Sequence, residues 1–171
     1  MEFRAAGSVD AANLAALTLQ VWLHTYAKGG IRGALSNYVL SEFTAEKFRS
    51  VLTDQSQMII LCEVDAHLVG YVRLDFSSPC PIDDSVHAEI STLYVQAHFL
   101  RQGIGTQLLL RALDTFRRRG RRAVWLSVNH ENVDAIGFYD RQGFEHQGSI
   151  DFELDGERHE NYVLRRALSE V

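Results

Sequence analysis

The sequence changes from an alternating pattern to a helical one across two glycines, and this change restricts the fold more than any other feature. Residues 87–95 alternate well enough to form a strand. One face of that strand would carry Glu89, Ser91, Leu93 and Val95. Residues 104–119 instead have apolar side chains at helical spacing, at Leu109, Ala112, Leu113 and Phe116. The pattern predicts a strand, a loop and a helix in succession, with Gly103 and Gly105 where the helix begins.

The remaining segments alternate between strand and helix patterns. Further strands are expected at residues 2–5, 58–64, 68–76, 123–128, 145–154 and 159–164. Further helices are expected after an N-cap at Ser8, over residues 45–52 and over residues 132–141. The dipeptide Asp155-Gly156 is typical of a hairpin turn, and the glycines between residues 29 and 33 interrupt regular structure. Together these patterns predict one mixed α/β domain over residues 1–171.

Composition excludes several classes of function. The chain has 171 residues, 46% hydrophobic and 23% charged, as in an ordinary globular domain. It contains no apolar run of the ~20 residues that a membrane span needs, and its first residues show no secretory signal. A cytoplasmic location is therefore expected. The net charge of −5 argues against nucleic-acid binding. The histidines and the two cysteines show no metal-binding spacing, so no metal is expected.

The glycine junction suits an anion. Gly103 and Gly105 have no side chain to keep a ligand from the backbone, and the free N–H groups of a helix start bind phosphate oxygens. Thr106 adds a hydroxyl. A tight strand-to-helix corner would explain the same two glycines. A dinucleotide-binding motif would need a third glycine where Leu108 stands, and a P-loop would need Gly-Lys followed by Ser or Thr, which the chain lacks.

The junction resembles the pyrophosphate loop of the GNAT superfamily of N-acetyltransferases. In that family the loop follows the pattern Gln/Arg-x-x-Gly-x-Gly/Ala, after a strand that often ends in Leu-Tyr-Val. This chain has Leu93-Tyr94-Val95 and then Leu100-Arg101-Gln102-Gly103-Ile104-Gly105. It departs from the pattern at the first position, where Leu100 stands. Because the family holds pyrophosphate mainly through backbone amides, the resemblance implies that this departure is tolerated.

A second motif of the same family lies further along the chain. The family pattern is Asn-x-x-Ala-x-x-Phe-Tyr-x-x-x-Gly-Phe. This chain matches it at each fixed position, with Asn132, Ala135, Phe138, Tyr139, Gly143 and Phe144. The order and spacing of the two motifs make coincidence a poor explanation, and the resemblance covers at least residues 89–144.

The resemblance implies a GNAT fold, with a mixed, mostly antiparallel sheet of six to seven strands and helices on both faces. Two neighbouring strands, residues 87–95 and 123–128, would splay apart to admit the pantetheine arm of acetyl-CoA. Leu93, Tyr94 and Val95 would pair with that arm. The segment from Arg101 through Gln102, Gly103, Ile104 and Gly105 to Thr106 would hold the pyrophosphate, and Asn132 and Phe138 would lie beside the cofactor.

The family chemistry implied by this resemblance is direct attack of an amine on the thioester. Tyr139 occupies the position that commonly protonates the leaving thiolate, and its phenol suits that task. Most of a lysine-like amine is protonated at neutral pH, so its proton must be removed. Glu89 is the candidate base because it lies on the motif strand, near where the family often places a glutamate. Each residue also has a structural explanation: Tyr139 as a core tyrosine, and Glu89 as a partly solvated or ion-paired strand carboxylate.

Trp22, His24 and Tyr26 follow the apolar face of the first helix. In the family this region often borders the acceptor pocket, and aromatic faces attract cations, so the three residues are candidates for substrate binding. Packing at a helix end is the alternative. The arginines of residues 117–122 are explained as a solvated helix end whose cations complement the helix dipole.

The sequence therefore predicts an enzyme, an acetyl-CoA-dependent N-acyltransferase whose acceptor is a primary amine of a small molecule or a peptide. A second hypothesis is a regulatory module that keeps the acyl-CoA site without catalysis. Domains of this family often pair, so the resemblance allows a homodimer. The patterns indicate no nucleic-acid or membrane partner.

Overall fold

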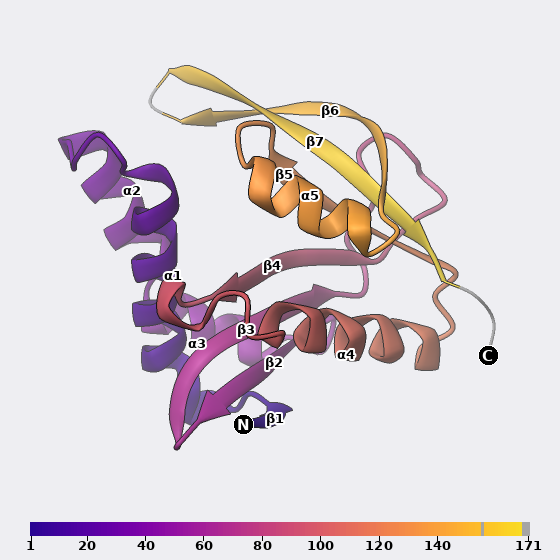
Figure 1. The fold of residues 1–171 in the computed structure, drawn as a ribbon, viewed down its shortest axis with the longest axis horizontal. Helices are drawn as coiled ribbons and strands as arrows, with labels where there is room; N and C mark the ends of the chain where they lie inside the picture. Colours follow the sequence, from indigo (N-terminus) through magenta and orange to yellow (C-terminus); the bar gives the residue numbers. More distant parts are fainter. Residues whose placement is uncertain (155, 169–171) are drawn as a thin grey trace. The chain divides into compact units, whose positions relative to one another are not determined.

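The computed structural model describes residues 1–154 and 156–168. Its chain divides into two compact units, Met1–Leu74 with Thr92–Ala112, and Asp75–Ser91 with Leu113–Val171. Strand β4 (Glu89–Val95) and helix α4 (Ile104–Arg118), both labelled in Figure 1, each include residues of both units. No helix in the described ranges is both long and apolar enough to cross a membrane.

The first unit begins with β1 (Glu2–Ala5) and a 3-10 turn (Ser8–Asp10). Helices α1 (Ala11–Tyr26), α2 (Gly33–Glu42) and α3 (Ala45–Thr53) follow. Strands β2 (Gln57–Val64) and β3 (His67–Asp75) come next, and a second 3-10 turn (Ala97–Phe99) separates β4 from α4. Helix α1 starts after the 3-10 turn rather than directly after Ser8, because residues 8–10 form the tighter turn first.

Helix α2 is a difference from the sequence-based expectation, which placed irregular structure there. Its first residue is Gly33, and only Val39 of its ten residues is buried. Glycine weakens a helix interior, but the first helical position makes fewer demands on the backbone. A single buried residue leaves little apolar periodicity, so the pattern did not reveal the helix.

The second unit contains β5 (Ala123–Asn129), α5 (Val133–Arg141), β6 (Glu145–Leu154) and β7 (Glu157–Ala167). Strand β7 is longer than predicted. It pairs antiparallel with β6 along a ladder from Glu145↔Arg165 to Leu154↔Glu157, with one register shift between His146 and Gly148. Of the predicted turn dipeptide, Asp155 lies outside the described residues, and Gly156 has a φ of +76°.

The seven strands lie in the order β1-β2-β3-β4-β5-β7-β6. Among the pairings with a described register, β4–β5 is parallel, whereas β1–β2, β5–β7 and β6–β7 are antiparallel. The expected mixed, mostly antiparallel sheet is therefore confirmed.

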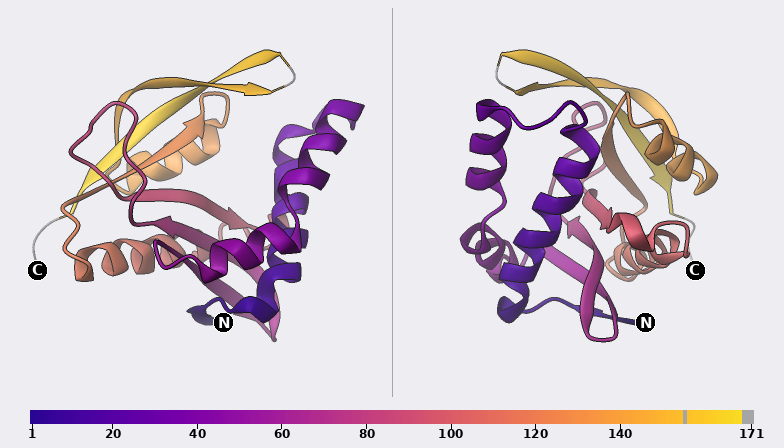
Figure 2. Two further views of the ribbon diagram at one scale, coloured as in Figure 1. Left: turned by 180° about the vertical axis from the view of Figure 1, so that it is seen from behind. Right: turned by 60° about the vertical axis from the view of Figure 1, so that its left-hand side comes forward.

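Helices cover both faces of the sheet in the first unit (Figure 2). On one face Leu14, Phe48, Ile59, Leu61 and Tyr71 form a buried cluster that joins α1 and α3 to β2 and β3. On the other face α4 approaches the strands. The guanidinium of Arg111 lies 3.8 Å from the centroid of the Phe3 ring. Strand β2 is buried on both sides, which explains its nearly continuous apolar run.

In the second unit the loop between β3 and β4 packs against one face of β5 and β7. Cys80 and Val86 of the loop cluster with Ala123, Trp125 and Val163 of the two strands. The indole N–H of Trp125 donates to the backbone oxygen of Ser78 at 3.1 Å. Helix α5 lies on the opposite face (Figures 1 and 2).

Candidate active site

The turn between β4 and α4 exposes backbone at the start of a helix. Arg101 and Gly103 both have positive φ, +61° and +80°, so the chain bends sharply just before Ile104. Glycine adopts such a conformation at little cost. The N–H of Gln107 bonds back to the Gly103 oxygen at 3.0 Å. The N–H groups of the preceding first-turn residues have no partner within the helix, which is the property of helix starts that favours anions.

The space beside this turn is open. A methyl group placed on Gly103 would have no atom of another residue within 4 Å, apart from its chain neighbours. Arg101 and Gln102 are exposed, and the Gln102 amide donates to the His98 oxygen at 3.1 Å. Leu100, the residue that departs from the family pattern, is 53% exposed. The residues of this turn therefore fit a diphosphate group held by backbone amides.

The end of β4 that leads into the turn is tightly held. A Cβ on Gly70 of β3 would lie 2.8 Å from the Tyr94 carbonyl oxygen, closer than real Cβ contacts, and a tight 3.2 Å from a Val95 methyl group. The Gln96 amide donates to the Gln20 side chain at 2.7 Å, and the Gln96 N–H donates to the Val69 oxygen at 2.9 Å. Glycine at position 70 therefore brings β3 close to the segment from Leu93 to Val95.

Within the second unit, the register pairs Glu89 of β4 with Trp125 of β5. The Trp125 N–H also donates to the Ala88 oxygen at 2.9 Å. The parting of these strands further along β4, which the family resemblance implies, stays a prediction.

The fixed residues of the second motif build helix α5. The Asn132 side chain accepts a hydrogen bond from the Ala135 N–H at 3.2 Å and so caps the helix start. At the other end Gly143 has a φ of +76°. The N–H of Phe144 bonds to the Tyr139 oxygen at 3.0 Å, and the N–H of Gly143 to the Asp140 oxygen at 2.9 Å. These two bonds form a Schellman motif.

Tyr139 is held by this helix ending. Its side chain is 8% exposed. The ring lies 5.2 Å from Phe138 and 5.5 Å from Phe144, both in edge-on arrangements. Glu89, at the first residue of β4, is half-buried. The two catalytic candidates, Tyr139 and Glu89, thus both belong to the second unit, together with Asn132 and Phe138.

Two of the three acceptor candidates lie together and the third does not. Trp22 and Tyr26 are four residues apart on α1, and their ring centroids lie 4.9 Å apart. Trp22 is 8% exposed and Tyr26 41% exposed. His24 lies two residues from each, which places it on a different side of the helix. It is exposed.

Helix α2 and the residue after it complete an aromatic cluster that the sequence patterns did not reveal. Tyr38 lies 5.3 Å and Phe43 lies 6.1 Å from Trp22, measured between ring centroids. We call Trp22, Tyr26, Tyr38 and Phe43 the aromatic cluster. Burial raises the pKa of the Tyr26 and Tyr38 phenols, so both stay neutral at physiological pH. The only sequence signal for this cluster was the pair of aromatic residues within 38–43. The patterns predicted no helix there that would have placed them beside Trp22.

Within residues 1–154 and 156–168, no group of three or more His, Cys, Asp or Glu side chains is arranged to hold a metal ion. Cys62 and Cys80 are buried free thiols.

Comparison with known proteins matches residues 29–144 to the Acetyltransferase (GNAT) family. An uncharacterised N-acetyltransferase of Methanocaldococcus jannaschii is 38% identical over 57% of this chain and 43% of its own length. The match therefore spans less than half of that relative. An uncharacterised N-acetyltransferase of Mycobacterium bovis is 32% identical over 78% of this chain and 82% of its own length.

Two further comparisons involve Thermoplasma acidophilum. Its spermidine N(1)-acetyltransferase is 24% identical over 85% of this chain and 88% of its own length. The crystal structure of the PaiA N-acetyltransferase from this organism, in complex with coenzyme A, has the same fold with a TM-score of 0.78. That likeness covers 97% of this chain and 98% of the other, at 20% identity.

Proposed function

Because this chain belongs to the GNAT family of acetyltransferases, we propose that it transfers the acetyl group of acetyl-CoA to a primary amine of a small molecule or a peptide. The observation that carries the proposal is the turn at Gly103. Open space beside a positive-φ glycine leads directly into the first turn of α4. That geometry suits a diphosphate held by backbone amides.

In this proposal the turn and the end of β4 before it bind different parts of acetyl-CoA. The N–H groups at Gly103, Ile104 and Gly105, with the Thr106 hydroxyl, bind the diphosphate, and Arg101 and Gln102 border it. The backbone of Leu93, Tyr94 and Val95 pairs with the pantetheine arm. One N–H of that segment donates to the thioester oxygen and stabilises the negative charge that develops there. Asn132 and Phe138 contact the same cofactor.

The proposed chemistry is one displacement at the thioester carbon. Glu89 takes a proton from the bound ammonium through a water molecule, which frees the nitrogen lone pair. The nitrogen forms a bond to the acetyl carbon, the carbon–sulfur bond breaks, and the nitrogen releases its second proton to solvent to give the neutral amide. Tyr139 donates its phenolic proton to the departing sulfur and then regains a proton from solvent. The products are an N-acetylated amine and coenzyme A.

The aromatic cluster supports a cationic acceptor. The faces of tyrosine and tryptophan attract ammonium groups, and Tyr26 presents a 41% exposed ring at the edge of the cluster. The related Thermoplasma enzyme is a spermidine N(1)-acetyltransferase, which makes polyamines the first acceptors to test. We propose Trp22 and Tyr26 as acceptor contacts, with His24 in a peripheral position. The reaction is proposed to take place in the cytoplasm.

The test is release of thiol from acetyl-CoA in the presence of a panel of amines, including spermidine, lysine and a peptide with a free N-terminus. We expect amine-dependent release with at least one class. Tyr139→Phe should lower kcat by about 100-fold, since general acid catalysis contributes roughly that much or more. It should leave the Kd for coenzyme A unchanged.

Tyr162→Phe is the matched control, because it removes a tyrosine hydroxyl from β7 in the same unit. Its kcat should match that of the parent chain. Binding of coenzyme A without thiol release for any amine would instead support a regulatory acyl-CoA-binding module.

A further inference from the structure

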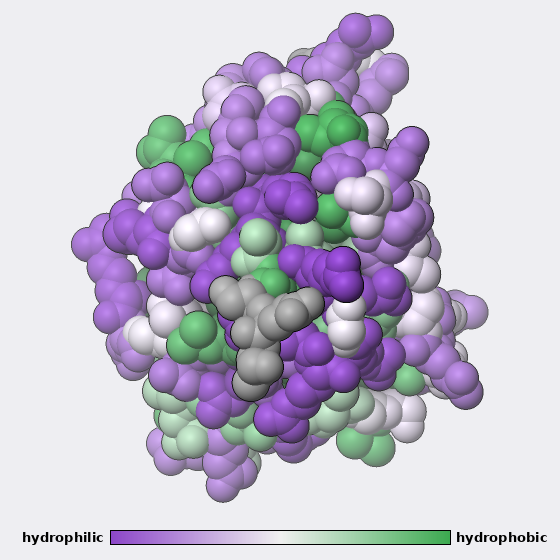
Figure 3. Space-filling view, turned by 90° about the vertical axis from the view of Figure 1, so that its right-hand side faces the viewer, coloured by the Kyte–Doolittle hydropathy of each residue, from purple (hydrophilic) through white to green (hydrophobic). Residues whose placement is uncertain are grey.

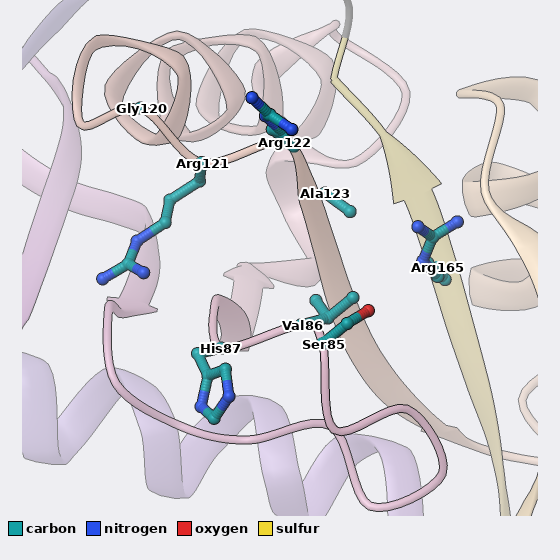
Figure 4. A pocket seen from close by; sticks show the side chains of 8 residues that line it. All are labelled: Ser85, Val86, His87, Gly120, Arg121, Arg122, Ala123 and Arg165. Atoms are coloured by element: carbon teal, nitrogen blue, oxygen red, sulfur yellow. The ribbon is translucent and has the colours of Figure 1, made fainter.

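A second polar site lies in the second unit, and none of the residues proposed for acetyl transfer line it. It is a cavity of about 460 Å³. Three segments line it: the end of the loop before β4, the turn between α4 and β5, and β7 (Figure 4). The lining residues are Ser85, Val86, His87, Gly120, Arg121, Arg122, Ala123 and Arg165. They include three guanidinium groups and no carboxylate.

The site lies at the starts of β4 and β5, whereas the Gly103 turn follows the end of β4. Figure 3 shows the side of the molecule where α4 and β7 end, and its surface is mostly hydrophilic. Seven of the chain's positive residues lie in residues 117–122 and 165–166. This concentration contrasts with the net charge of −5 for the whole chain.

Arg121 is fixed in place by backbone and side-chain bonds. Helix α4 ends in a Schellman motif, in which Gly120 has a φ of +72° and the Arg121 N–H bonds to the Phe116 oxygen at 3.0 Å. The Arg121 Nη2 donates to the Phe76 oxygen at 2.5 Å. Its Nε is buried and has no hydrogen-bond partner in the structure. A buried donor without a partner costs free energy, and a ligand acceptor would recover it.

Arg165 is only partly neutralised. Its Nε is also buried without a hydrogen-bond partner, and it lies 3.5 Å from the nearer Asp83 carboxylate oxygen. The other Asp83 oxygen accepts hydrogen bonds from the Ser85 N–H and hydroxyl, at 3.0 and 2.5 Å. These bonds, with the Arg165 charge, lower the pKa of Asp83. Asp83 does not line the cavity, whose lining residues include three guanidinium groups and no carboxylate.

The third arginine, Arg122, has an exposed side chain, but its backbone is tied to the end of β7. The Leu168 N–H donates to the Arg122 oxygen at 2.8 Å. In the view of Figure 4, Arg121 and Arg165 lie on opposite sides of Val86 and Ala123. The positive groups are thus spread around the cavity instead of converging on one point.

We propose that this cavity binds a multivalent anion of the organic polyphosphate class. Guanidinium groups match phosphate oxygens with paired N–H donors and keep their charge at all physiological pH values. The spread of three such groups around about 460 Å³ fits an anion with more than one phosphate group better than a single phosphate ion. The inference is independent of the proposed acetyl transfer, because it uses none of those residues.

The test is calorimetric titration of inorganic tripolyphosphate into protein saturated with one equivalent of coenzyme A. One equivalent occupies the Gly103 turn proposed above, and an excess is avoided because coenzyme A is itself an organic polyphosphate that would compete for the cavity. We expect one equivalent to bind. Arg165→Gln and Arg122→Gln should each raise its Kd by about tenfold, since a hydrogen bond to a charged group contributes about that much. Arg122 is exposed, so its variant tests the site even if Arg165→Gln disturbs folding.

Arg118→Gln is the matched control. Like the two cavity variants, it replaces one arginine by glutamine. Arg118 lies on α4 outside the cavity, and its side chain is 79% exposed and pairs with Asp114 at 2.9 Å. Its effect on the Kd should be less than twofold. The inference is wrong if tripolyphosphate does not bind the saturated protein, if either cavity variant binds as the parent does, or if Arg118→Gln weakens binding as much as they do.

Discussion

Tyr71 carries its hydroxyl group inside the apolar core of the first unit. Its side chain is 1% exposed, and its oxygen lies 2.6 Å from the Thr18 hydroxyl. Burial raises the pKa of the Tyr71 phenol from 10.0 to about 12, against the opposing effect of hydrogen bonds with Thr18 and Thr92. The neutral phenol is therefore favoured in the folded state far more than in the unfolded one.

This preference predicts a loss of stability in alkali. Above pH 10 the unfolded chain ionises Tyr71, whereas the folded chain keeps the proton until about pH 12. The stabilising contribution is complete below pH 10 and falls as the pH rises towards 12. A shift of this size corresponds to about 2 to 3 kcal/mol. Urea unfolding at a series of pH values should show the decline.

Tyr71→Phe should be less stable than the parent at neutral pH by about 1 to 3 kcal/mol, because it loses its buried hydrogen bonds with Thr18 and Thr92. Thr18 remains satisfied, since its hydroxyl also donates to the Leu14 oxygen at 2.7 Å. The decline above pH 10 should become shallower in this variant. An unchanged decline would show that other groups cause it.

At the scale of elements, the capping of α5 separates two roles of Asn132. The side chain caps the helix, and we propose that it also contacts the cofactor. Asn132→Ala should lose about 1 kcal/mol of stability. Asn132→Asp should keep the cap and the stability, because a carboxylate accepts the same N–H bond, but it lacks the amide donor and adds a negative charge that would disfavour a polyanionic cofactor.

Thermal unfolding and the Kd for coenzyme A, measured on both variants, check this prediction. The cofactor role requires Asn132→Asp to weaken coenzyme A binding while its Tm stays near that of the parent. Equal binding by Asn132→Asp and the parent would leave Asn132 with the capping role alone.

The contact between β3 and β4 gives a second prediction at this scale. Gly70→Ala would place a methyl group 2.8 Å from the Tyr94 oxygen, so the backbone of β4 must move. Strain of this kind costs about 1 to 3 kcal/mol. We expect a lower Tm and a weaker Kd for coenzyme A, because the displaced segment is the one proposed to pair with the pantetheine arm.

Gly33→Ala is the control, because a Cβ there meets nothing within 4 Å. It stands at the first residue of α2, where alanine should leave the Tm unchanged or raise it slightly. If Gly70→Ala behaves like Gly33→Ala, close packing at Gly70 does not position β4.

At the scale of the molecule, we predict that residues 1–171 unfold as one domain. The chain has two tryptophans, Trp22 in the first unit and Trp125 in the second. Strand β4 and helix α4 each contain residues of both units. Unfolding of one unit would therefore disrupt a strand and a helix that the other unit also needs. Trp125→Phe and Trp22→Phe leave one fluorescent reporter in each unit.

Under this prediction, the fluorescence of each single-tryptophan variant should change at the same urea concentration as its far-UV circular dichroism. Trp22 and Trp125 are both buried, with exposed fractions of 8% and 6%. The fluorescence of each should therefore change strongly on unfolding. In either variant, a fluorescence midpoint clearly apart from the circular dichroism midpoint would indicate two independently folding domains.

Much of this organisation could be predicted from local patterns. The family, the mixed sheet and the class of enzyme, an acetyl-CoA-dependent N-acyltransferase, are confirmed. The roles assigned to individual site residues stay predictions. The patterns were sufficient where a strand or helix buries a regular apolar face, as α4 does. They failed at α2, where one buried residue provides no periodic signal.

The sequence by itself determined the backbone chemistry of this protein, because glycines at 103 and 143 and an N-cap at Asn132 act on their immediate neighbours. Only the tertiary structure decided which distant side chains meet. It joined Tyr38 and Phe43 to Trp22, and it brought Arg165 to the cavity that Arg121 and Arg122 line. Such contacts depend on packing and register between segments far apart in the chain, and no local pattern contains that information.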